Sequence, residues 1–193
     1  MFSYEKVLAV ISDDVGVKPF NQRPGTFPAS PHPGQHSYAG SQDGQRWLAN
    51  FTSEEGHFSV LMPEIPTDKS ETVDSAHGPY TTHLFVVRDT TSVYLIGWVD
   101  YDPSFNFNRQ AELEANRDNF VKGINAHLVS SRPTMIDGYS AIEFTAETDD
   151  RVFKSRVDRV GRRPYQIVIG SPKGQDDSAN VNRFFNSFKV SLP

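Results

Sequence analysis

The sequence predicts an α+β fold in which a five- to six-stranded antiparallel sheet is packed with helices and preceded by an extended N-terminal arm. From about Trp47 onward, apolar runs of strand length alternate with turn residues, as in an antiparallel sheet. Two stretches instead repeat their apolar residues at helical spacing. Residues 1–45 hold five prolines and five glycines, which are incompatible with regular sheet or helix. We therefore expect an arm over residues 1–45 and one α+β domain over residues 46–193.

The predicted strands form two groups. In the first, residues 58–62 form a strand that ends at Pro63, and residues 81–88 and 93–101 form a hairpin across a four-residue turn. The strand over residues 93–101 has apolar side chains on both faces, which is typical of a central strand. The second group is a meander of three strands over residues 139–148, 152–160 and 165–170.

Two helices are predicted to place an apolar face on this sheet. One spans residues 108–125, and the other spans residues 176–187 with Asp176 or Asp177 as its cap. The residues expected to face the sheet are Leu113, Phe120, Ile124 and Leu128 from the first, and Val181, Phe184, Phe185 and Phe188 from the second.

The composition restricts the chemistry and the partners of the chain. With 19 Lys plus Arg against 24 Asp plus Glu, the net charge of −5 argues against a nucleic-acid partner. The absence of cysteine excludes disulfides, thiol nucleophiles and cysteine-ligated metals. The N-terminal apolar run from Val7 to Ile11 is too short for a signal peptide or a transmembrane helix. We expect a cytoplasmic protein peripheral to a membrane, with a previously removed signal sequence as the alternative.

The sequence also lacks the common catalytic signatures, including the nucleophile elbow, the phosphate-binding loop and the HExxH zinc motif. We therefore expect a protein that is not an enzyme and uses no cofactor. His32 and His36 have metal-ligand spacing, but Pro31 and Pro33 prevent the helix that this spacing requires. His83 lies within a predicted strand, and we interpret it as a hydrogen-bonded sheet histidine rather than a catalytic base.

Two sets of residues are candidates for partner binding. The first is the apolar start of the arm, with Phe2, Tyr4, Val7, Leu8, Val10 and Ile11. The second is a basic hairpin over residues 151–163, which contains six basic residues and one acidic residue, Asp158. We expect the basic side chains on the outer side of the hairpin. The hairpin residues expected to contact an acidic protein surface or lipid headgroups are Lys154, Arg156, Arg159, Arg162 and Arg163. An ordinary solvated strand face is the alternative.

Two segments resemble a known family. Residues 51–63, FTSEEGHFSVLMP, and residues 183–188, RFFNSF, are similar to the opening strand and closing helix of bacterial domains with the fold of PsbP, the extrinsic subunit of photosystem II. The resemblance covers about residues 47–192. It implies an α/β/α sandwich without a shared active site, in a group whose members dock through a surface and an N-terminal extension. This sequence lacks the export signal or lipid-anchor cysteine common in that group.

The leading hypothesis is a non-catalytic peripheral subunit that docks onto and stabilises a larger, membrane-bound photosynthetic or bioenergetic complex. Its expected partners are protein subunits of that complex, together with a membrane surface. One alternative is a small ligand-binding or hydrolytic domain with a pocket between sheet and helix near Tyr94, Trp98 and Tyr139. Another is an adaptor for secretion or protein folding.

Overall fold

A computed structural model describes residues 49–75, 78–105, 108–175 and 177–191, and the predicted arm lies outside these residues. The described strands are β1 (Ala49–Ser53), β2 (Phe58–Met62), β3 (Thr67–Val73), β4 (Tyr80–Arg88), β5 (Val93–Tyr101), β6 (His127–Ile136), β7 (Tyr139–Glu147), β8 (Arg151–Val160), β9 (Arg163–Pro172) and β10 (Lys189–Val190). The described helices are α2 (Arg109–Gly123) and α3 (Ser178–Ser187).

The strands form two antiparallel sheets. The large sheet has seven strands in the order β3-β4-β5-β9-β8-β7-β6, and the small sheet has three in the order β1-β2-β10. The predicted number of five to six strands was therefore too low. The hairpin of β4 and β5, the meander from β7 to β9 and the central position of β5 are confirmed.

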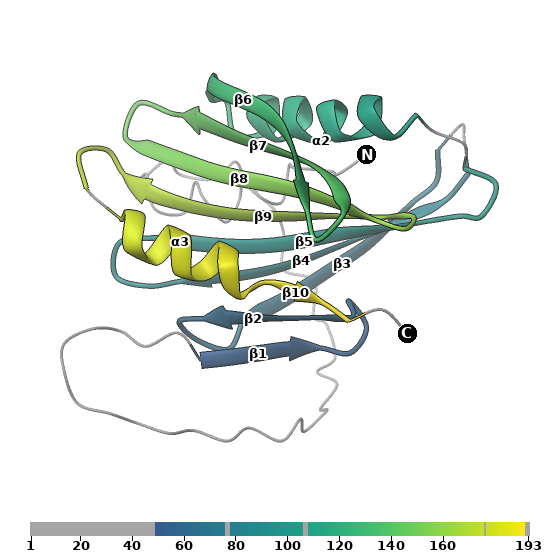
Figure 1. Cartoon of the computed structure of the whole chain (residues 1–193), viewed down its shortest axis with the longest axis horizontal. Coiled ribbons are helices and arrows are strands. Elements are labelled where there is room, and N and C mark those ends of the chain that lie inside the picture. Colours follow the sequence, from purple (N-terminus) through teal and green to yellow (C-terminus); the bar gives the residue numbers. More distant parts are fainter. Residues whose placement is uncertain (1–48, 76–77, 106–107, 176, 192–193) are drawn as a thin grey trace, which may run out of the picture.

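The large sheet is covered on both faces. Helix α2 packs on β6, β7 and β8 on one face, whereas α3 and the small sheet lie on the opposite face (Figure 1). The two layers enclose separate apolar cores because successive side chains of a strand point to opposite faces. Leu95 and Val99 of β5 join the core beneath α2, whereas Tyr94, Ile96 and Trp98 join the other core.

Helix α2 begins where the sequence indicates. The Asn108 side chain accepts hydrogen bonds from the backbone N–H groups of Gln110 (3.0 Å) and Ala111 (3.2 Å), as a helix N-cap does. The helix ends earlier than predicted, because Asn125 takes a left-handed φ of 51° that turns the chain into β6. Leu128 consequently lies in β6 and is 41% exposed, so its predicted place on the helix face was wrong.

Gly170 of β9 lets an aromatic ring pack directly on the backbone beneath α2. A Cβ at this position would lie 2.6 Å from Cε1 of Phe153 and 2.9 Å from Cγ1 of Val93, and the Phe153 side chain is fully buried. Both distances are shorter than carbon–carbon contact allows, so a methyl group would force the Phe153 ring to move.

We therefore expect Gly170→Ala to lower the free energy of unfolding by about 1–3 kcal/mol, the usual cost of overpacking a core. Denaturant unfolding of the full chain measures this change. An unchanged midpoint and slope would show that the Phe153 ring moves aside without loss of packing.

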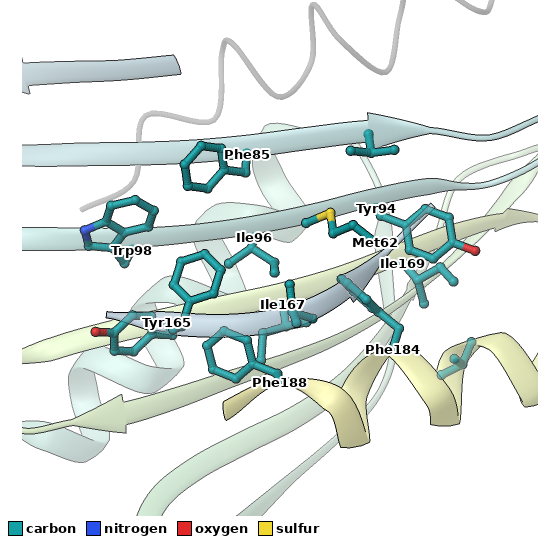
Figure 2. Close-up of a cluster of buried hydrophobic side chains, with 14 of the residues drawn as sticks. Met62, Phe85, Tyr94, Ile96, Trp98, Tyr165, Ile167, Ile169, Phe184 and Phe188 are labelled. Carbon is teal, nitrogen blue, oxygen red and sulfur yellow. The ribbon is translucent and has the colours of Figure 1, made fainter. Parts of the chain in front are cut away.

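The second core, between the large sheet and α3, is rich in aromatic residues (Figure 2). The Phe184 ring of α3 meets the ring of Tyr94 edge-on, with centroids 5.2 Å apart, and Phe58 of β2 meets Trp98 in the same way at 5.7 Å. Edge-to-face contacts of this kind add to the stabilisation that burial of apolar area already gives. This aromatic core holds α3 and the small sheet on the large one.

Candidate functional site

Two arginines of the basic hairpin of β8 and β9 do not face solvent as predicted. Arg156 and Arg159 are each only 5% exposed, because each lies under a different covering layer. The Nε atom of Arg156 lies 2.8 Å from Oδ1 of Asp158, and the guanidinium carbon lies 5.6 Å from the ring centroid of Phe185 in α3. The expected outer position of these two arginines was therefore wrong.

Arg159 lies on the opposite face of β8, beneath α2. Its Nε donates to Oε2 of Glu112 on the helix, and both side chains are almost fully buried. Burial raises the pKa of Glu112, and the positive charge of Arg159 opposes this shift. Burial, with the neighbouring Glu112 carboxylate, also raises the pKa of Tyr101. The pair thus fastens α2 to the sheet and is not available for docking.

The other three binding candidates of the hairpin differ in exposure. Arg162 is exposed, and its Nη2 donates to the backbone carbonyls of Asp102 (3.1 Å) and Phe105 (3.0 Å). Arg163 is half-buried and donates to the backbone carbonyl of Glu55 (2.9 Å). Lys154 is half-buried. Partner binding by these residues stays a prediction, as it does for Phe2, Tyr4, Val7, Leu8, Val10 and Ile11, which lie outside the described residues.

A cluster of ionisable side chains surrounds His83, where the turn after β1 meets the large sheet. The His83 ring is 4% exposed and stacks on Trp98, with centroids 4.4 Å apart and planes 2° from parallel. Its Nε2 lies 3.4 Å from Oδ2 of Asp100, and its Nδ1 lies 3.6 Å from Oε1 of Glu55. His83 is thus buried in β4 beside two carboxylates, and its interpretation as a hydrogen-bonded sheet histidine rather than a catalytic base stays a prediction.

The carboxylates of this cluster have opposite pKa shifts. Burial disfavours ionisation of Asp100, but hydrogen bonds from His83 and Arg163 outweigh it and hold the pKa below its usual value. Burial raises the pKa of Asp68 on β3, and the nearby Glu55 carboxylate adds to this effect. The charges connect the turn after β1 with β3, β4, β5 and β9, so the arrangement is that of a structural ion network.

The Asp100 shift predicts a pH dependence of stability. Because its folded pKa lies below 3.8, the ionised carboxylate stabilises the fold at higher pH, and this contribution is lost as the pH falls through the folded pKa. We expect Asp100→Asn to be less stable than the wild type near neutral pH and the difference to shrink below pH 3.8. Urea unfolding at a series of pH values measures this, with the exposed Asp118→Asn as the control. A difference that does not change with pH would contradict the ion network.

The pocket expected near Tyr94, Trp98 and Tyr139 is occupied by side chains at the first two, and Tyr139 is half-buried and packs against the same core. Tyr94 and Trp98 are 1% and 0% exposed, and Phe184 and Phe58 occupy the space against them. The structure instead has an open hollow of about 400 Å³ at the edge formed by β3 and β4. Its lining residues are Glu64, Ile65, Thr67, Lys69, Val86, Val87 and Arg88. The sequence could not indicate this hollow, because it depends on where the chain enters β3.

Known proteins match this chain in structure but not in sequence. No protein-family model and no curated protein matches it. The solution structure of cyanobacterial PsbP (CyanoP) from Synechocystis sp. PCC 6803 aligns with a TM-score of 0.51 and 14% identity, over 78% of this chain and 98% of that one. A crystal structure from Bacteroides thetaiotaomicron VPI-5482 aligns with a TM-score of 0.37 and 14% identity, over 77% of this chain and 50% of that one. The two-layered cover of the antiparallel sheet and the alignment to CyanoP together show that this chain has a PsbP-like fold.

Proposed function

We propose that this protein is a non-catalytic, extrinsic subunit that docks onto and stabilises a larger, membrane-bound photosynthetic or bioenergetic complex. The observation that carries the proposal is the PsbP-like fold, which spans 98% of the cyanobacterial PsbP chain. Because function depends on sites and not on fold alone, the proposal needs a direct test.

The use of the polar residues supports a binding role over a catalytic one. Buried charges are paired within the protein rather than turned toward a cleft, Arg159 with Glu112 on one face of β8 and Arg156 with Asp158 on the other. The hollow at the β3 and β4 edge is lined by Thr67, Lys69 and Val86, which lie on the face of the sheet opposite to His83. Among the described residues, no helix is both long and apolar enough to cross a bilayer.

Native electrophoresis and native mass analysis of gently solubilised membranes from the source cells test this proposal. We expect the tagged full chain to be recovered in a large complex at fixed stoichiometry, and a chain of residues 46–193 to be lost from it while it melts at the wild-type temperature. Recovery of the wild type only at 21.7 kDa would overturn the proposal. Full occupancy by the truncated chain would overturn the role of the arm and leave docking to the body.

A further inference from the structure

Strand β6 carries an unusual share of exposed apolar surface. Leu128, Val129 and Met135 are 41%, 52% and 61% exposed, and Ile65 is the remaining large apolar side chain of this kind among the described residues. β6 forms one outer edge of the large sheet, and among the described strands β7 alone pairs with it (Figure 1). An outer edge has unpaired backbone groups, and exposed apolar residues there indicate a binding surface.

The register of β6 places its apolar groups at both ends. Leu128 pairs with Ala146 near one end and Met135 pairs with Ser140 near the other, and an irregularity at Val129 separates the two registers. Between them Arg132 pairs with Glu143, and the Arg132 side chain is 75% exposed. Directly paired residues share a face of the sheet, so Leu128 and Met135 lie on the face covered by α2, whereas Arg132 between them lies on the opposite face.

Pro133 limits what can pair with this edge. A proline is tolerated in an edge strand where its nitrogen points away from the neighbouring strand, so Ser131, Pro133 and Met135 direct their backbone groups outward. Only Ser131 and Met135 of these three can donate a hydrogen bond, because proline has no N–H group. The edge can therefore accept one short segment but does not support a long, repeating ladder.

Charge identifies the kind of segment that fits. β6 contains no acidic residue, although the chain carries a net charge of −5. Its Arg132 side chain is 75% exposed while it forms an ion pair. The Glu143 carboxylate that pairs with Arg132 lies on β7 and is 26% exposed. A carboxylate on an incoming strand would meet Arg132 from the free side of β6, on the face of the sheet opposite to Leu128 and Met135.

We propose that β6 is the surface on which a partner protein docks an extended segment, with an acidic side chain on one face and apolar side chains before and after it on the other face. This assignment rests on the function proposed above and names the surface of the body that the partner contacts. A second copy of this chain fits less well. If two copies of β6 paired antiparallel with Val129 opposite Met135, Arg132 of one copy would lie directly opposite Arg132 of the other. The two like charges would repel each other.

Site-specific photo-crosslinking in the source cells tests the proposal with the full chain. A benzoylphenylalanine replaces Val129 in one variant and Ile65 in the matched control, which is 56% exposed on the far side of the sheet. We expect crosslinks from position 129 to an apolar segment containing Asp or Glu in one other protein, and at least tenfold fewer from position 65. If position 129 crosslinks to a second copy or to lipid, or forms no crosslink, while the large complex stays intact, the assignment of the surface to β6 is overturned. The proposed function is unaffected by that result. Recovery of the wild type only as a monomer would overturn both proposals.

A charge substitution gives an independent measurement. We expect the double variant Val129→Glu and Met135→Glu to reduce recovery in the large complex at least tenfold, whereas Ile65→Glu leaves recovery unchanged. All three positions are more than half exposed, so the variants are expected to keep the wild-type melting temperature. Recovery of the double variant at the wild-type level would overturn the proposal. If the double variant melts at a lower temperature, Arg132→Glu takes its place, and we expect the same tenfold loss of recovery in the large complex.

Discussion

Truncation of Phe184 to alanine is expected to lower the free energy of unfolding by about 3–5 kcal/mol, the usual cost of removing a buried aromatic ring. Phe184 is 0% exposed and lies between α3 and the large sheet, where its ring meets that of Tyr94. The surrounding rings belong to several strands and cannot all move into the space that the ring leaves. Equilibrium unfolding in urea measures the loss.

The adjacent phenylalanine is the matched control. Phe185 is only half-buried, and its ring lies beneath the Arg156 guanidinium rather than within the aromatic core. Phe185→Ala removes this contact and part of the buried area, so we expect it to cost about 1 kcal/mol. Equal losses for the two variants would mean that α3 is held to the sheet by its whole apolar face and not mainly by Phe184.

The sequence was sufficient for the strands and helix faces that are buried. β5 has apolar side chains on both faces because covering layers lie on both sides of it, and this pattern gave its bounds of Val93–Tyr101 without error. The spacing of Leu113, Phe120 and Ile124 likewise identified the buried side of α2. Burial on a regular backbone leaves a periodic signal in the sequence, and these elements have it.

The edge strands were missed because they lack that signal. β3 reads Thr-Asp-Lys-Ser-Glu-Thr-Val and is mostly exposed, and β6 contains Pro133 and a run of exposed polar residues. Neither strand has to place apolar groups on one face, since no layer covers it fully. The strand predicted over residues 58–62 belongs to the small sheet, so five predicted strands lie in the large sheet, and β3 and β6 bring its number to seven.

The environment of the basic hairpin could not be predicted for a different reason. Alternation correctly placed Lys154, Arg156 and Asp158 on one face of β8, but it does not reveal which element covers that face. The Glu112 partner of Arg159 lies 47 positions earlier in the chain. Such pairs depend on how a helix crosses a sheet, which is a property of the tertiary fold, so the same charges suggested a docking surface from the sequence alone.

Breaking the buried pair of Arg159 and Glu112 is expected to be strongly destabilising. Arg159→Met leaves the Glu112 carboxylate buried without its countercharge, and Glu112→Leu does the same to the guanidinium, so each single variant should lose about 3–5 kcal/mol. The double variant Glu112→Leu and Arg159→Met leaves no buried charge, and we expect its free energy of unfolding to lie within about 2 kcal/mol of the wild type. An exposed pair provides the control: Arg132→Met should cost no more than about 1 kcal/mol.

The same variants separate the structural role of the hairpin arginines from a docking role. Because Arg159 and Glu112 are each less than a tenth exposed, the folded double variant has the same outer surface as the wild type. We therefore expect it to be recovered in the large complex as fully as the wild type, whereas the exposed β6 double variant is not. A stable double variant that no longer enters the complex would contradict this separation, because it would mean that the position of α2 on the sheet shapes the surface that the partner binds.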